Sequence, residues 1–544
     1  MDEALVAPRT ETTNAISAIG SGLPSRPRQG RSDSVRNCVN NTLAIFLTGV
    51  LGCLLAAAPV AAAEYAFELT LDPAVRAEPF TGRVYLFFAQ GDREPRFGPN
   101  WFNPGPMLAV DVRDWKPGEP LSINTTDESR LIVFPKALRD QDLSGLNVQA
   151  VARFNPLVRE VGAGTGNGFS AVAKVEGADG KPAGAKLAID KVVEERKFPE
   201  NEWCRLLDLR SELLSKFHGR DVHQRASVVL PASYQKEPDR RYPVIFVVQG
   251  FGGNHFAGLR KEPVVEDNPG GVEFLRVFLD AECGLGHHVF ADSDNNGPVG
   301  TALVRELIPA LDAQYRTIAD PTARFLTGHS SGGWSTLWLQ VAYPDTFGGC
   351  WSTAPDPVDF RDFQQINLYR PGENMYRDPQ GNRRPLGRSN GKVLLWYDDF
   401  DRMEELVGPG GQLHSFEAVF SPRAADGRPV RVWNRQTGAV DTKAAEAWKK
   451  YDIRHILETN WSTLGPKLAG KLHVIMGDAD TFYLEGATRL LQESQAKLKS
   501  DAVVELVPGK DHGTLLTREL TTRIRTEMAN SFLKHHPAPK ADAK

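Results

Sequence analysis

Residues 324–339 read RFLTGHSSGGWSTLWL and set one serine between a strand-like run and a helix-like run. The turn itself, residues 328–332, has the pattern G-x-S-x-G with Ser330 at its centre. A sharp turn from strand to helix leaves no room for side chains beside the serine, which accounts for the two glycines. The stretch therefore predicts that Ser330 stands at the end of a strand, at the positive end of the following helix.

A second G-x-S-x-G pattern surrounds Ser389, at residues 387–391. It follows the polar sequence RRP and precedes the strand-like VLLWY, so we expect a loop there. Because the pattern by itself is short and weak, its context decides, and the context favours Ser330 as a nucleophile over Ser389.

Two later loops offer an acid and a base for Ser330. In folds that use this turn, the order along the chain is serine, acid, histidine. His512 lies in the loop PGKDHG after an apolar run at residues 503–507, which suits a base. The run 472–476 leads into GDAD, which offers Asp478 and Asp480 as the acid. We favour Asp480, because it is further from the strand axis and can bend towards His512.

Backbone N–H groups that stabilise a developing oxyanion are expected at two places. One is Ser331, directly after the nucleophile. The other is the loop QGFGG that follows the apolar run 244–248, where Phe251 is the preferred donor and Gly252 the alternative. A glycine-rich turn without this role remains an open alternative.

From about residue 222 the chain alternates between short apolar runs and helical patterns, which is typical of an α/β fold with a mainly parallel sheet and helices on both faces. The expected strands are residues 226–230, 244–248, 289–291, 325–327, 472–476 and 503–507, and the expected helices are 271–281, 302–315, 336–343 and 517–533.

Two regions depart from this alternation. Residues 64–193 contain short runs of high β propensity separated by turn residues, which predicts a small β-sandwich-like domain before the α/β domain of residues 194–534. Residues 356–467 are polar, aromatic and irregular, and we expect a long insertion that acts as a cap, although an ordinary packed subdomain is nearly as well supported. Its aromatic side chains could line a pocket.

The N-terminal segment indicates export. Arginines precede the apolar residues 42–63, which end in three alanines, as in a secretory signal peptide. We expect residues 1–63 to be leader and signal, a mature chain beginning near Glu64, a periplasmic or extracellular location and no stable membrane insertion after cleavage. A retained membrane anchor is the alternative. Residues 535–544 are expected to be a disordered tail.

Composition limits the remaining classes. The formal net charge of −4 gives no reason to expect nucleic acid as a partner. Cys204, Cys283 and Cys350 would remain after cleavage, enough for at most one disulfide. The sequence DSDNNG at residues 292–297 imitates a calcium loop, but its twelfth position is Leu303 rather than glutamate. We predict neither a metal nor a cofactor.

Together these motifs resemble the esterase branch of the α/β-hydrolases that contains esterase D and enterochelin-esterase-like proteins, known as the putative esterases. The matching pieces are YPVIFVVQGFGG, NNGPVGTALVRELIPALDAQYR, GHSSGG, GDAD and DHG. The resemblance implies hydrolysis of a carboxylic ester by a triad of Ser330, Asp480 and His512, without a cofactor. The long block 356–467 departs from the family pattern and leaves the substrate, a small or polysaccharide-linked ester, undefined.

Two other functions stay open at this point. A serine peptidase or an acyltransferase could use the same three residues, because fold does not fix function. A carbohydrate- or surface-binding protein with an inactive hydrolase domain is the second alternative. Its support is a set of aromatic residues that could line a sugar site: Phe97, Trp101, Phe102 and Trp115. Such residues more often pack in a core or between domains.

Overall fold

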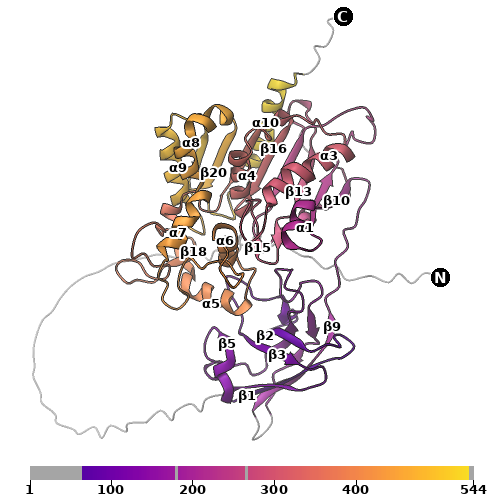
Figure 1. Ribbon diagram of the computed structural model, residues 1–544, viewed down its shortest axis with the longest axis vertical. Coiled ribbons are helices and arrows are strands. Elements are labelled where there is room, and N and C mark those ends of the chain that lie inside the picture. The colour runs from indigo at the N-terminus through magenta and orange to yellow at the C-terminus, as the bar shows by residue number, and fades with distance from the viewer. Residues whose placement is uncertain (1–63, 178–181, 264–267, 538–544) are drawn as a thin grey trace, which may run out of the picture. The chain divides into compact units, whose positions relative to one another are not determined.

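The computed structural model describes residues 64–177, 182–263 and 268–537. The described residues belong to one compact unit, coloured from indigo to yellow along the chain in Figure 1. The predicted leader and signal segment lie outside the described residues. No helix within the described ranges is long and apolar enough to cross a membrane.

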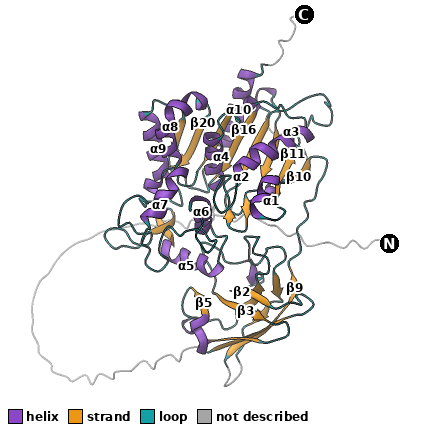
Figure 2. Ribbon diagram, viewed as in Figure 1, coloured by secondary structure: helices purple, strands orange, loops and turns teal. Residues whose placement is uncertain are grey.

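An eight-stranded sheet forms the centre of the second part of the chain (Figure 2). Its first two strands are antiparallel to their neighbours, and all later pairs are parallel. This is the mostly parallel sheet expected of an α/β-hydrolase-type domain. In spatial order the strands are β10 (Cys204–Arg210), β11 (His223–Val229), β13 (Leu275–Leu279), β12 (Val244–Val248), β16 (Arg324–His329), β17 (Gly349–Thr353), β20 (Leu472–Gly477) and β21 (Val503–Val507).

Helices pack on both faces of this sheet. Successive residues of a strand point to opposite sides, and in the central strands both sets of side chains are apolar. Phe246 and Val248 of β12 share a buried cluster with Trp334 of α4 (Ser331–Ala342). Ile245, which directly precedes Phe246 and so points to the opposite face, belongs to a second cluster with Met528 of α10 (Arg518–His535). The central strands are therefore covered on both faces, as their continuous apolar runs predict.

The remaining elements of this part connect or flank the sheet. Figure 1 shows α8 and α9 beside β20. The helices and short strands are α1 (Glu212–His218), β14 (Glu282–Cys283), β15 (Gly286–His287), α2 (Val299–Ala302), α3 (Ile308–Gln314), β18 (Pro385–Ser389), β19 (Lys392–Trp396), α5 (Tyr397–Val407), α6 (Gln412–Phe420), α7 (Thr442–Trp448), α8 (Ile453–Leu468) and α9 (Glu485–Lys497).

The first part of the chain forms a nine-stranded sheet. Eight strands follow the order β4 (Leu121–Asn124), β1 (Tyr65–Leu71), β9 (Ala183–Val192), β7 (Gly168–Ser170), β6 (Asn147–Ala152), β2 (Phe80–Ala89), β3 (Met107–Trp115) and β5 (Leu131–Phe134), while β8 (Ala173–Lys174) pairs with β6. All nine strands belong to one hydrogen-bonded sheet, so a sandwich of two separate sheets is not confirmed. Phe67 of β1 nevertheless contacts Phe88 of β2, with ring centroids 5.6 Å apart, so this sheet curls over its own core.

Three local expectations were wrong. Residues 271–281 hold strand β13 and no helix, because their apolar residues fit a buried strand as well as a helical face. Residues 289–291 form a turn with positive φ at Val289 and Phe290 rather than a strand. Ser389 lies in strand β18 rather than in a loop, since the sequence Asn-Gly that follows it makes the tight turn into β19.

The block at residues 356–467 is mostly packed structure. Its last helix, α8, contacts α4 and leads directly into β20, which is the position of a crossover helix. Phe420 packs against Phe416, Trp448 and the ring of Trp334, and all of these rings are buried. Trp433 is buried as well. These rings belong to the same buried cluster as Phe246 and Trp334, so the block is packed onto the core of the central sheet.

Candidate active site

Ser330 occupies a strained turn between β16 and α4. Its backbone has φ 61° and ψ −127°, in the left-handed half of conformational space that non-glycine residues rarely enter. A Cβ on Gly328 would lie 2.3 Å from the carbonyl oxygen of Gly332, and a Cβ on Gly332 would lie 2.0 Å from that of Val248. The two flanking glycines are therefore required by space, and strain of this kind concentrates at functional sites.

His512 and Asp480 form a buried pair. His512 Nδ1 lies 2.8 Å from Asp480 Oδ2, and the two residues are 4% and 0% exposed. The other oxygen of Asp480 accepts the backbone N–H of Phe482, also at 2.8 Å. Both carboxylate oxygens are thus engaged, which fixes the carboxylate and directs the Nδ1–H of the imidazole towards it.

Asp478 points elsewhere. Its carboxylate accepts the backbone N–H of Gly509 at 2.7 Å and is more exposed than that of Asp480. Asp478 thus ties together the loops after β20 and β21, while Asp480 is the acid that contacts His512.

Electrostatics at the pair favour a basic imidazole. Burial by itself would lower the pKa of His512, but the negative charge and hydrogen bond of Asp480 outweigh it and raise that pKa above its usual value. The neighbouring His329 shows the opposite effect, since burial and the proximity of His512 lower its pKa to about 3. The rings of His329 and His512 are 4.6 Å apart. His512 therefore lies beside the turn that carries Ser330.

The side chains of Ser330 and His512, both among the described residues, are not hydrogen-bonded to each other in this structure. Such contacts are commonly long before a substrate is bound and tighten in the complex.

The loop after β12 passes beside Ser330. A Cβ on Gly250 would lie 3.3 Å from the Cβ of Ser330, so the backbone here passes directly beside the serine. His287 Nε2 donates to the carbonyl of Gln249 at 2.9 Å, and burial lowers the pKa of His287 to about 4, which keeps its ring neutral. The predicted donors Phe251 and Ser331 belong to this loop and to the first turn of α4, whose N–H groups have no intrahelical acceptor.

The sequence did not reveal a second buried acid, Asp356, which contacts the residue after Ser330. Ser331 Oγ donates to Asp356 Oδ2 at 2.5 Å, and Gln412 Nε2 donates to the same oxygen at 3.4 Å. Burial raises the pKa of Asp356 to about 6, with the nearby Asp480 adding to the effect. Gln412 begins α6, so the block inserted after β17 reaches the residue next to Ser330.

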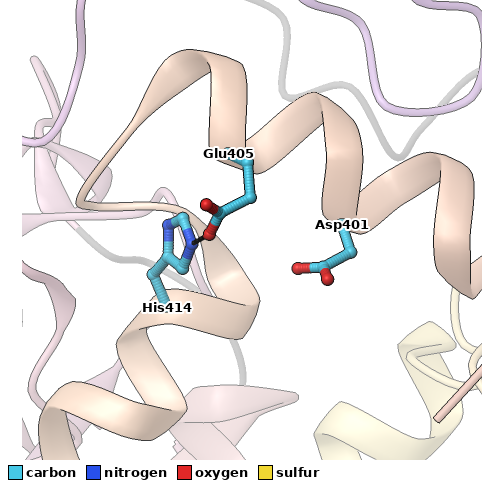
Figure 3. Close-up of side chains that lie close together, drawn as sticks. All are labelled: Asp401, Glu405 and His414. Carbon is cyan, nitrogen blue, oxygen red and sulfur yellow. Dashed lines mark hydrogen bonds and ion pairs between the residues drawn. The ribbon is translucent and has the colours of Figure 1, made fainter. Parts of the chain in front are cut away.

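One group of three possible metal ligands exists within the described ranges, namely Asp401, Glu405 and His414 (Figure 3). In the figure the carboxylate of Glu405 faces the ring of His414, and Asp401 lies along the same helix. Arg435 Nε lies 3.2 Å from both Asp401 and Glu405, so a guanidinium already supplies positive charge. Burial lowers the pKa of His414, but its hydrogen bond to Glu405 raises that pKa above its usual value, so a proton competes with a metal for the ring nitrogen. We interpret the group as a structural charge network.

Other residues of note also have structural roles. Asp292, in the calcium-like loop, caps α2 by accepting the N–H groups of Gly300 and Thr301. Cys204, Cys283 and Cys350 are all free thiols. Burial raises the pKa of Cys283 and of Cys350 to about 12, so neither is a reactive thiolate near neutral pH.

The sheet order and the strained serine turn define an α/β-hydrolase-type domain. Residues 291–513 match the model of the family described as "Putative esterase", which confirms the resemblance predicted from the motifs. The matched range includes Ser330, Asp480 and His512. An endo-1,4-beta-xylanase/feruloyl esterase of Xylanibacter ruminicola is 27% identical over 143 residues, which cover 23% of this chain and 18% of the relative. The match thus spans under a fifth of that relative.

The chain also matches solved structures at low sequence identity, including three from different organisms. A ferulic acid esterase of Anaeromyces mucronatus is 14% identical, covering 62% of this chain and 94% of its own, with a TM-score of 0.32. An S-formylglutathione hydrolase of Agrobacterium tumefaciens is 14% identical, with 61% and 94% covered and a TM-score of 0.34. A dipeptidyl peptidase 4 of Porphyromonas gingivalis is 13% identical, with 78% and 48% covered and a TM-score of 0.34. Likeness at this level carries no conclusion about activity.

Proposed function

We propose that this protein is a serine hydrolase that cleaves carboxylic esters with Ser330, His512 and Asp480. The observation that carries the proposal is the buried pair of His512 and Asp480, at 2.8 Å, beside a serine held at φ 61°. A serine, a histidine and a carboxylate in this order form the arrangement that activates a hydroxyl for attack on an acyl carbon. The esterase-family match over residues 291–513 favours an ester over an amide.

The proposed reaction has two halves. Ser330 Oγ attacks the ester carbonyl while His512 Nε2 accepts its proton, and the resulting oxyanion is stabilised by the N–H groups of Ser331 and Phe251. His512 then donates that proton to the leaving alcohol oxygen as the carbon–oxygen bond breaks. Water repeats the sequence on the acyl-enzyme, releasing the acid and restoring Ser330. Asp480 holds the imidazole in the tautomer that these steps require.

The inserted block has a positioning role in this proposal. Through Gln412 and Asp356 it holds the side chain of Ser331, whose backbone N–H is one of the two proposed oxyanion donors. This contact supports a direct link between the block and the site, even though most of its aromatic residues belong to a core.

The test is a substrate panel on the purified protein. It contains p-nitrophenyl acetate, a feruloyl ester, an acetylated sugar and, for the peptidase alternative, a peptidyl p-nitroanilide. The feruloyl ester is included because the curated relative bears that name. We expect ester hydrolysis that Ser330→Ala abolishes. Hydrolysis of the anilide in preference to every ester would favour a peptidase, and no hydrolysis of any substrate would contradict the proposal.

Export is the second part of the proposal. It rests on the apolar residues 42–63 and the alanines at their end, which have the order of a signal peptide. We expect the mature chain to begin near Glu64, where the described β strands start. N-terminal sequencing of protein recovered outside the cytoplasm checks this, and a mature chain that still contains residues 42–63 would contradict it.

A further inference from the structure

Two consecutive aromatic residues extend from the nine-stranded sheet to the loops of the proposed active site. Trp101 and Phe102 lie between the short helix η1 (Pro95–Phe97) and β3. The ring of Trp101 is 5.5 Å from that of Phe251, in the loop that carries a proposed oxyanion donor. The ring of Phe102 is 6.1 Å from that of Phe482, in the loop of the proposed acid. One short segment therefore contacts the loops on two sides of the site.

The two aromatic residues differ in how much surface they leave free. Trp101 also packs edge-on against Phe400 of α5, with centroids 5.1 Å apart, and is only partly exposed. Phe102 is 40% exposed. Trp101 is thus fixed in packing around Phe251, whereas Phe102 keeps a free face that a ligand can cover.

Phe482 connects Phe102 to the base. Its ring meets that of His512 edge to face, with centroids 5.0 Å apart. Its backbone N–H is held by Asp480, so the position of Phe482 is coupled to the acid. The ring of Phe482 therefore contacts both Phe102 and His512, the residue proposed to transfer the proton.

The chemistry of ester cleavage defines which part of a substrate passes there. His512 must donate its proton to the oxygen of the leaving alcohol, so that oxygen has to lie within hydrogen-bond distance of Nε2. The atoms attached to this oxygen then extend over the surface beside His512. Phe482 and Phe102 form part of that surface, and the acyl group lies on the other side of the scissile bond.

We propose that Phe102, supplied by the nine-stranded sheet, selects the alcohol portion of the ester. This inference rests on the proposed function. A flat, largely apolar face suits an exposed aromatic ring, so the preferred alcohols carry an aryl ring or the C–H face of a sugar ring. The first part of the chain thereby acts as a specificity element of the catalytic site.

Trp101 has a different role, that of a positioning residue. Phe251 is contacted by the Trp101 ring and by the guanidinium of Arg159, whose carbon lies 4.8 Å from the ring centre. Arg159 is itself held by Glu282, with Nε 2.7 Å from the carboxylate. Loss of Trp101 therefore loosens the loop of a proposed oxyanion donor and slows all substrates alike.

The test uses acetate esters that share the acyl group and differ in the alcohol: 1-naphthyl acetate, an acetylated methyl glycoside and ethyl acetate. For each, kcat/KM of Phe102→Ala is divided by that of the unchanged protein, which cancels the intrinsic reactivity of the ester. We expect a loss of about five- to tenfold for a ring-bearing alcohol and less than twofold for ethyl acetate. The naphthyl and glycoside esters show whether the preferred ring is aryl or sugar. Trp101→Ala should lower kcat/KM for all three esters by the same factor.

Phe97→Ala is the matched control, because Phe97 is 41% exposed in the same part of the chain and its ring lies against Arg96. It should leave all three ratios near one, and Phe102→Leu should retain part of the preference. Equal losses for ethyl and ring-bearing esters in Phe102→Ala, in protein with an unchanged melting temperature, would overturn the inference alone. Failure of the unchanged protein to hydrolyse any ester would instead overturn the proposed function.

Discussion

Replacing Asp480 by asparagine tests how the acid acts. In the structure its two oxygens accept two different donors, Nδ1–H of His512 and N–H of Phe482, each at 2.8 Å. Asparagine has one oxygen and one NH₂ group. If the oxygen stays on Phe482, the NH₂ group faces Nδ1 and forces the ring into the tautomer with its hydrogen on Nε2. That ring cannot accept the proton of Ser330.

The expected loss follows from this wrong tautomer. Because attack must wait for a minor tautomer and the imidazolium loses its charged partner, kcat should fall by about 10⁴-fold, the size seen when a triad aspartate is changed in this way. At about 1.4 kcal/mol for each factor of ten, this corresponds to about 5.5 kcal/mol of transition-state stabilisation. The fold should be retained, since the substitution keeps the volume of the side chain.

The assay compares Asp480→Asn with Asp478→Asn by initial rates on p-nitrophenyl acetate, with folding followed by circular dichroism. Asp478 accepts only the backbone N–H of Gly509 among the described residues, and the asparagine oxygen can replace it, so kcat should change less than threefold. A damaging Asp478→Asn together with a near-normal Asp480→Asn would refute the reasoning.

Three further predictions concern ionisation and charge. On the acid side, kcat/KM should fall with a midpoint above pH 6.5, because only neutral His512 accepts a proton and its pKa is raised above the usual value. A pH profile with its midpoint well below pH 6.5 would contradict this. Asp356→Asn should move this midpoint to lower pH, because it removes a negative charge that raises the pKa of His512, and an unmoved midpoint would exclude the coupling. In denaturant unfolding, Arg435→Met should cost about 3–5 kcal/mol by leaving buried carboxylates unpaired. The half-exposed control Arg431→Met should cost under about 1 kcal/mol, and equal costs would argue against the network.

Much of the catalytic domain could be predicted from local sequence, because each proposed site residue follows a strand with a clear apolar run. The expected strands 244–248 and 503–507 have the same bounds in the structure as β12 and β21. Asp356 was not predicted, because the strand before it, β17, reads GCWST and has neither an apolar run nor an alternating pattern. Its contacts to Ser331 and Gln412 join three segments that are distant in sequence.

The contacts of Trp101 and the charge network of Arg435 could not be predicted for a similar reason. An exposed-looking aromatic residue and an isolated arginine have no local pattern, and their partners are determined by packing of distant segments. The sequence PGKDHG, in contrast, placed His512 on a loop after a strand without any knowledge of its partner. Short-range patterns thus point to candidate reactive residues, whereas the surfaces proposed to select a substrate depend on tertiary structure.

The most direct test of the central claim is labelling of the intact protein with a fluorophosphonate probe, followed by intact mass measurement and peptide mapping. The reagent forms a covalent bond only with an activated hydroxyl, so it reports the nucleophile without any assumption about the substrate. The account predicts one adduct, on the peptide that contains Ser330, which is lost in Ser330→Ala and unchanged in Ser389→Ala. An adduct on Ser389, or no labelled serine at all in folded protein, would contradict it.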